Sequence, residues 1–144
     1  MFQVQVGAVK ERKIKTLIEI RGEDELTLRV LLRDIDRDDA VEAREFEGEL
    51  TWSGSLQGSW PLLVAREDIV EWQDVLDYLD AGENAKWAPS GRALNLAFAR
   101  DIDRGGWYID VLHPTFPYIK IRMHFDPDEE WFETSYRTLS EVLA

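Results

Sequence analysis

Short segments that alternate apolar and polar residues constrain this chain more than any other feature. In residues 26–33 every second residue is leucine or valine, and the residues between them are mostly threonine or arginine. A period of two predicts a strand with one buried face. A strand-like run at residues 14–21 precedes it, and a polar turn at residues 22–25 joins the two. The sequence therefore predicts a β-hairpin at residues 14–33.

Five further strands are predicted from the same kind of pattern. Residues 46–52 and 56–64 flank a Ser-Gly-Ser turn, and residues 94–98, 107–112 and 119–125 follow later in the chain. Pro61 has no N–H to donate, so we expect the fourth strand either to lie at an edge of the sheet or to be broken at this residue. The links between strands are too short for parallel crossovers, so we expect antiparallel pairing.

Two amphipathic helices complete the pattern. Residues 66–81 carry large apolar side chains at helical spacing, and Gly82 stands where a helix commonly ends. The second helix is expected to follow Asp126 as its cap, with Pro127 at the first helical position. The stripes predicted to be buried are Ile69, Trp72, Leu76 and Leu79 in the first helix, and Phe132, Tyr136, Leu139 and Leu143 in the second.

These elements predict an α+β fold. Apolar residues make up 44% of the 144 residues and include six tryptophans, which is enough for one packed core. We expect a single domain over residues 1–144. Its architecture is expected to be a mainly antiparallel sheet of six to seven strands with two helices packed on one face.

The net charge of −12 excludes several classes of function. Residues 1–33 have a net charge of +2 and residues 34–144 a net charge of −14, so most of the chain would repel a phosphate backbone. We therefore expect no nucleic-acid partner. No apolar run approaches the roughly 20 residues of a membrane helix, so no membrane partner is expected either. The absence of cysteine and of a signal-peptide pattern favours a cytoplasmic location.

No catalytic or cofactor motif is present. The chain contains neither a G-x-S-x-G nucleophile elbow nor a phosphate-binding loop leading into a helix. His113 and His124 are its two histidines, and His124 with Asp126 supplies two metal ligands on one strand face, whereas zinc usually takes three or four. We therefore predict a non-enzymatic protein with no catalytic residue, no cofactor and no metal.

The outward face of the first helix is the candidate site. If the apolar stripe is buried, the remaining positions bring acidic residues and one aromatic residue to the surface or its flank. Trp87 follows the helix and adds an indole that suits recognition if it is exposed, or packing over the helix if it is not. The candidate partner-binding residues are Glu67, Glu71, Asp74, Asp77, Tyr78 and Trp87.

The segment from Leu62 to Trp87 carries a resemblance to a known group. Its strand Leu62-Leu63-Val64, the acidic helix with its tryptophan and leucines, Ala81-Gly82 and finally Trp87 resemble small acidic actinobacterial proteins of unknown function. The resemblance extends over roughly residues 17–100. The size, acidity and α+β make-up are also similar to those of bacterial toxin-immunity proteins.

Three classes of function stay open from the sequence. The first is a protein-interaction module, most concretely an immunity-type inhibitor that binds a basic partner protein. The second is a structural or accessory subunit, in which the acidic face is only solvated. The third is a small-ligand binder or an enzyme whose site is scattered along the chain. The sequence leaves the oligomeric state open.

Overall fold

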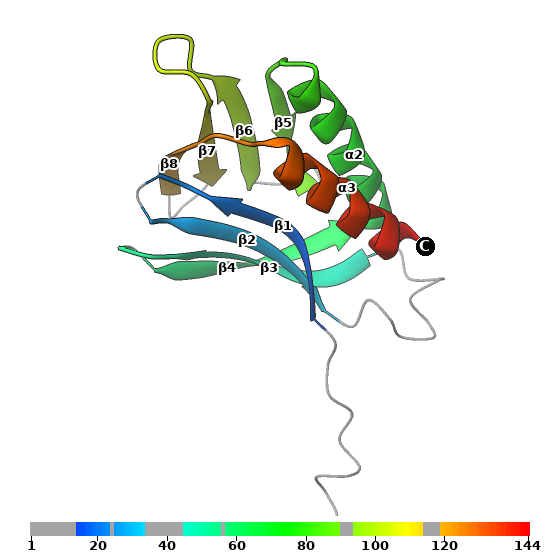
Figure 1. Cartoon of the computed structure of the whole chain (residues 1–144). Helices are drawn as coiled ribbons and strands as arrows, with labels where there is room; N and C mark the ends of the chain where they lie inside the picture. The colour runs from blue at the N-terminus through cyan, green and yellow to red at the C-terminus, as the bar shows by residue number, and fades with distance from the viewer. Residues whose placement is uncertain (1–13, 24, 34–44, 56, 90–93, 114–118) are drawn as a thin grey trace, which may run out of the picture.

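The computed structural model describes residues 14–23, 25–33, 45–55, 57–89, 94–113 and 119–144. Within them the chain forms eight strands and two helices (Figure 1). The strands are β1 (Ile14–Arg21), β2 (Thr27–Arg33), β3 (Glu45–Ser53), β4 (Gly58–Ala65), β5 (Ala85–Trp87), β6 (Asn95–Arg100), β7 (Trp107–His113) and β8 (Ile119–Phe125). The helices are α2 (Arg66–Asp80) and α3 (Glu129–Leu143). Leu56, where the sequence predicts the fourth strand to begin, lies outside the described residues.

The strands form two sheets, so the prediction of one sheet with six to seven strands is wrong. Sheet A has the order β1-β2-β3-β4 and sheet B the order β5-β6-β7-β8, and every pair is antiparallel. Each sheet is a meander of consecutive strands, and α2 separates the two in the chain (Figure 1). Antiparallel pairing and the α+β class are confirmed. Of the two alternatives predicted from Pro61, the end position of β4 is confirmed.

Helix α2 packs against elements of both sheets. It follows directly on β4, and its Trp72 side chain is fully buried. The Trp72 ring lies 5.9 Å from the ring of Trp87 on β5 and 5.9 Å from that of Phe98 on β6. At its start, the Asp68 carboxylate accepts a hydrogen bond of 2.7 Å from the backbone N–H of Ala65. The buried stripe predicted for this helix is confirmed, and Asp68 and Val75 are buried beside it.

Helix α3 lies beside α2 and also touches both sheets (Figure 1). The indole N–H of Trp131 donates a 2.8 Å hydrogen bond to the carbonyl of Glu19 in β1, and the Trp131 ring lies 5.5 Å from that of Phe125 in β8. The cap of this helix is Asp128, which accepts a hydrogen bond from the Trp131 N–H, so the prediction of Asp126 is wrong. An aspartate caps a helix only where the backbone N–H three residues further along the chain points back at its carboxylate. The chain enters this helix two residues later than expected, so Asp128 meets that condition and Asp126 does not.

The buried stripe of α3 also differs from the prediction. Leu139 is buried as expected, and Val142 is buried in addition. Phe132, Tyr136 and Leu143 are only partly buried and pack against the edge of the core. The helix therefore contacts the core over a narrower strip than α2 does.

We predict that Leu76→Ala lowers the free energy of unfolding by about 2–5 kcal/mol, the usual cost of truncating a buried leucine. Leu76 is fully buried in the middle of the α2 stripe. Val70→Ala on the exposed side of the same helix is the control, and it should cost less than about 1 kcal/mol. Chemical denaturation of the three proteins measures both values, and equal losses for the two variants would contradict the packing described here.

Candidate interaction surface on helix α2

The side of α2 that faces away from the core is acidic with an apolar centre. At 100° per residue, Val70 and Asp74 point directly away from the buried stripe, and Glu67, Glu71 and Tyr78 lie next to them. All five side chains are exposed; Val70 retains 47% and Tyr78 51% of their accessible area. We call these five residues the α2 surface.

Helix α3 sets one boundary of the α2 surface. The hydroxyl group of Tyr136 donates a 2.7 Å hydrogen bond to the Asp77 carboxylate, and the Arg66 guanidinium donates one of 3.1 Å to the carbonyl of Leu143. The two helices are therefore antiparallel, and α3 lies on the flank of α2 that carries Arg66 and Asp77. Burial, followed by the hydrogen bond to Asp77, raises the pKa of Tyr136 above its usual range. Asp77 is exposed as predicted, but it is engaged at the helix junction.

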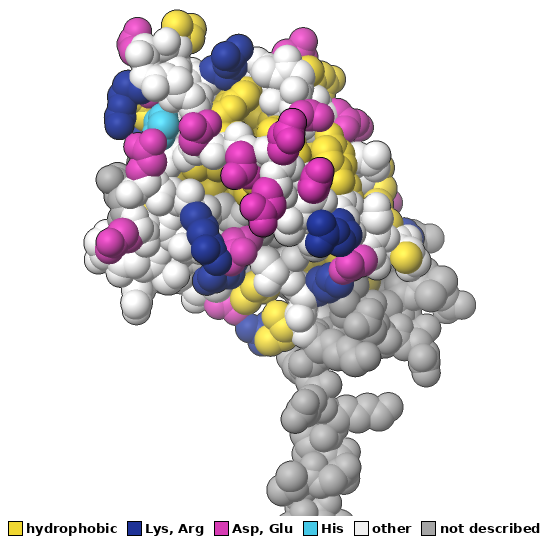
Figure 2. All heavy atoms as spheres, viewed as in Figure 1, with side chains coloured by type: hydrophobic (Ala, Val, Ile, Leu, Met, Phe, Trp, Pro, Cys, Tyr) yellow, Lys and Arg dark blue, Asp and Glu magenta, His cyan; other side chains and the backbone are white. Residues whose placement is uncertain are grey.

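The two helices hold most of the excess negative charge. Between them they contain ten acidic residues and two arginines, a net charge of −8, while the whole chain carries −12. Acidic side chains gather across the face that α2 and α3 present (Figure 2). The α2 surface thus lies within the most acidic region of the described chain.

Trp87 does not belong to the α2 surface, which corrects its place among the candidate residues. It is 1% exposed, and its indole N–H donates a 2.8 Å hydrogen bond to the carbonyl of Asp68. The tryptophan closes the core between α2 and β6 instead of facing a partner. Conversely, Val70 was missing from the predicted set. Its helical angle, opposite the buried stripe, is the sequence signal that identifies it.

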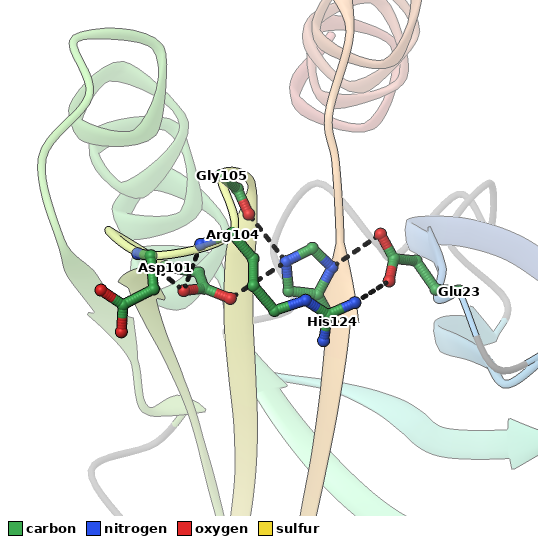
Figure 3. A network of polar contacts seen from close by, with 6 residues as sticks. Glu23, Asp101, Arg104, Gly105 and His124 are labelled. Carbon is green, nitrogen blue, oxygen red and sulfur yellow. Dashed lines mark hydrogen bonds and ion pairs between the residues drawn. The ribbon is translucent and has the colours of Figure 1, made fainter.

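A second polar cluster connects the two sheets (Figure 3). His124 on β8 has its Nδ1 atom 3.0 Å from a carboxylate oxygen of Glu23, which follows β1. Its Nε2 atom lies 2.8 Å from the carbonyl oxygen of Gly105 and 3.5 Å from the Asp101 carboxylate, both between β6 and β7. Because a carbonyl oxygen only accepts, Nε2 carries the proton of that hydrogen bond. Sequence reasoning missed this cluster because its members are far apart in the chain.

The cluster is built as a bridge between the sheets. Asp101 is buried and also accepts hydrogen bonds of 3.1 Å from the N–H groups of Asp103 and Arg104, while Arg104 is 3.3 Å from Glu23. Both nitrogen atoms of the imidazole face oxygen atoms, which holds the ring in place. The pairing of His124 with Asp126, considered from the sequence, is replaced by pairing with Glu23 and Asp101. Among the described residues, no three metal-ligating side chains are arranged to hold an ion.

An open groove of about 930 Å³ lies beside β4. Ser59, Trp60, Pro61, Leu62 and Leu63 of that strand line one side. Across from them are residues next to or within sheet B, namely Pro89, Leu94 and His113. The groove is a separate feature from the α2 surface, although Ala65 at its end is also the residue before α2.

The fold and these surfaces define an α+β protein of two antiparallel meanders joined by a helix pair. Among the described residues, neither helix is long and apolar enough to cross a membrane. The chain belongs to a family of unknown function, DUF5959, whose model matches residues 15–144. No curated protein and no solved structure matches it.

We predict that the contribution of Asp101 to stability falls at acid pH. Burial alone raises the pKa of Asp101, but hydrogen bonds from Arg104, Tyr108 and Asp103 and the charge of His124 outweigh it and lower the pKa below its usual value. Stability from this group is fully present above about pH 4, the ordinary carboxyl pKa, and is lost as the pH falls through the lower folded pKa.

The variant Asp101→Asn tests this prediction, since its amide is neutral at every pH. The difference in unfolding free energy between the wild type and the variant should be largest above about pH 5 and shrink towards about pH 2. Urea denaturation across this range measures it. A difference that does not change with pH would show that the charge of Asp101 does not stabilise the fold.

Proposed function

We propose that this protein is a non-enzymatic protein-interaction module whose α2 surface binds a basic partner protein. The observation that carries the proposal is the placement of Val70 and Tyr78, exposed, among Glu67, Glu71 and Asp74. Apolar and aromatic side chains supply contact area, while the surrounding carboxylates select and steer a basic partner. No cation lies among the five residues of this surface.

Glu67 and Asp68 in the first turn suit the helix dipole, but the charge layout of the rest of α2 does not serve the stability of the helix, which supports the same proposal. Glu67, Glu71 and Asp74 are spaced four and three residues apart, where like charges repel by a few tenths of a kcal/mol per pair. Asp77 and Asp80 stand in the last turn, where the helix dipole favours cations, and that turn has no basic residue. Cations from a bound partner would reduce both the repulsion between these carboxylates and their unfavourable interaction with the helix dipole.

We propose further that the partner is a basic toxin domain and that the protein acts as an immunity-type inhibitor in the cytoplasm of an actinobacterium. A protein that must neutralise a toxin in the producing cell benefits from fast association, and opposite charges raise association rates. The small size and the acidity of the chain fit such a role. In the alternative, an accessory subunit, the acids only keep the surface solvated.

We predict that the double variant Glu71→Lys with Asp74→Lys keeps the fold but slows association. Both side chains are exposed, so unfolding should be little changed, while reversal of two charges removes the steering of a basic partner. The partner is taken from a pull-down in the native host or from the neighbouring gene. Association rates are then measured at two salt concentrations, and the salt dependence should be flatter for the variant.

The matched control for this experiment is Glu130→Lys with Glu133→Lys. It makes the same change in net charge at exposed positions on α3, outside the α2 surface. The control should affect association less than the α2 variant does. Equal rates for the wild type and the α2 variant, or capture of an acidic partner, would exclude the proposal.

We predict that Val70→Ser with Tyr78→Ser acts on dissociation instead. Removing apolar contact area without changing charge leaves the encounter rate nearly unchanged but weakens the docked complex. The dissociation rate should rise by about ten-fold or more, corresponding to roughly 1.4 kcal/mol. Surface plasmon resonance separates the two rates. A change confined to the association rate would mean that these two residues are not in the contact.

A further inference from the structure

The turn between β6 and β7 presents one apolar side chain to solvent. Ile102 near its tip retains 94% of its accessible area, more than any other large apolar residue that the structure describes. The turn projects from the body of the protein at the end of its two strands (Figure 1). Turns favour glycine, asparagine, aspartate and serine, so a β-branched apolar residue is unusual here. Isolated exposed apolar residues are common on proteins, and exposure alone does not mark a binding site.

The rigid frame of the turn is what distinguishes Ile102. The buried Asp101 carboxylate accepts hydrogen bonds of 3.1 Å from the N–H groups of Asp103 and Arg104. The backbone of Asp101 also forms hydrogen bonds of 3.0 Å and 2.9 Å with the two glycines that close the turn. These four bonds fix the loop on both sides of Ile102. A side chain held on a fixed loop loses little conformational freedom when it docks.

The groove beside β4 has the apolar walls that such a side chain requires. On the side of the core it is lined by Leu62 and Leu94, which are buried, and by Trp60, which packs against the edge of the core. On the other side it extends over the outer face of sheet A, past Pro61 and Leu63 and on to residues of β2 and β3. A volume of about 930 Å³ is in the range of sites that hold a whole small molecule, so the groove can take the tip of a turn.

The turn and the groove lie at opposite ends of the same two strands. Leu94 stands directly before β6 and His113 is the last residue of β7, and both line the groove. Ile102 follows the other end of β6. The six residues of this strand span about 20 Å. Ile102 therefore cannot reach the groove of its own chain, whereas the turn of a second copy can.

We propose that the protein associates with itself head to tail, with Ile102 of one copy inserted into the groove beside β4 of the next. The two contacting surfaces differ, so the contact is heterologous and need not stop at a dimer. A turn is small compared with the 20–30 residues that each side of a standard stable interface contributes. The association is therefore weak and depends on the protein concentration. It stands whether or not the α2 surface binds a partner.

The dependence on salt separates this contact from the proposed binding of a basic partner. Two copies with a net charge of −12 each repel one another. Salt screens that repulsion, so a higher salt concentration should strengthen self-association. The same change weakens the attraction between the α2 surface and a basic protein. The two contacts therefore respond to salt with opposite signs.

The test is sedimentation velocity of the whole protein at concentrations up to about 1 mM, which covers weak association. The average mass should rise with protein concentration and with salt. Ile102→Ser removes apolar contact area at constant charge and should weaken association about ten-fold or more. Ile102→Leu should retain it. Val70→Ser removes an exposed apolar side chain from α2 instead and should leave self-association unchanged.

Mixing two variants identifies both halves of the contact. Trp60→Ala removes one wall of the groove and keeps the turn intact. Leu63→Gln changes the groove at a side chain that is 54% exposed, so it serves if Trp60→Ala does not fold. Neither a groove variant nor Ile102→Ser should self-associate alone. An equimolar mixture should form a heterodimer and stop there, because one intact turn meets one intact groove and no further pair is left.

Four results would overturn the proposal. A monomer at every protein and salt concentration would show that the groove takes no second copy. Unchanged association of Ile102→Ser would exclude the turn from the contact. Association of the wild type without a heterodimer in the mixture would mean that the contact is not between turn and groove. Association that weakens as salt is added would mean that attraction between charged surfaces causes it.

Discussion

The packing of Trp72 is the contact on which the rest of the structure depends. Neither sheet folds over its own apolar face, so each meander needs a cover supplied by another element. Trp72 reaches the rings of Trp87 and Phe98 in sheet B, while α2 itself continues directly from β4 of sheet A. Helix α3 also contacts both sheets through one tryptophan. The Trp131 indole donates a hydrogen bond to the carbonyl of Glu19 in sheet A, and its ring packs against Phe125 in sheet B. One helix pair therefore provides a core for two separate sheets.

This arrangement fixes which side of α2 is available for function. Packing against the sheets takes the stripe around Trp72, and α3 takes the flank at Arg66 and Asp77. What remains is the side centred on Val70 and Asp74. The position of the α2 surface thus follows from the core, but its acidity does not, because burial of the opposite stripe places no demand on the charge of exposed residues. That independence is why the acids call for an explanation outside folding.

The sequence predicted the local elements well and their long-range assembly less well. Periods of two and 3.6 residues identified both helices and every strand except β5, whose three residues are too few to show a period. The division into two sheets depends on contacts across α2, which no local pattern encodes. The same limit explains Trp87, whose burial depends on its contacts with Asp68 and Trp72. It also explains the His124 cluster, because Asp101 lies 23 positions and Glu23 lies 101 positions before His124 in the chain. The exposed acids of α2 were predictable because helix geometry alone places them.

The charge of the helix pair and the apolar side chains of the α2 surface would act at different distances from a partner. The helix pair has a net charge of −8, and such a field acts over distances comparable to the Debye length, about 8 Å at physiological salt. Val70 and Tyr78, by contrast, can contribute only where another surface touches them. If the proposal is right, the acids would therefore govern how fast a basic partner arrives, and the two apolar side chains how long it stays.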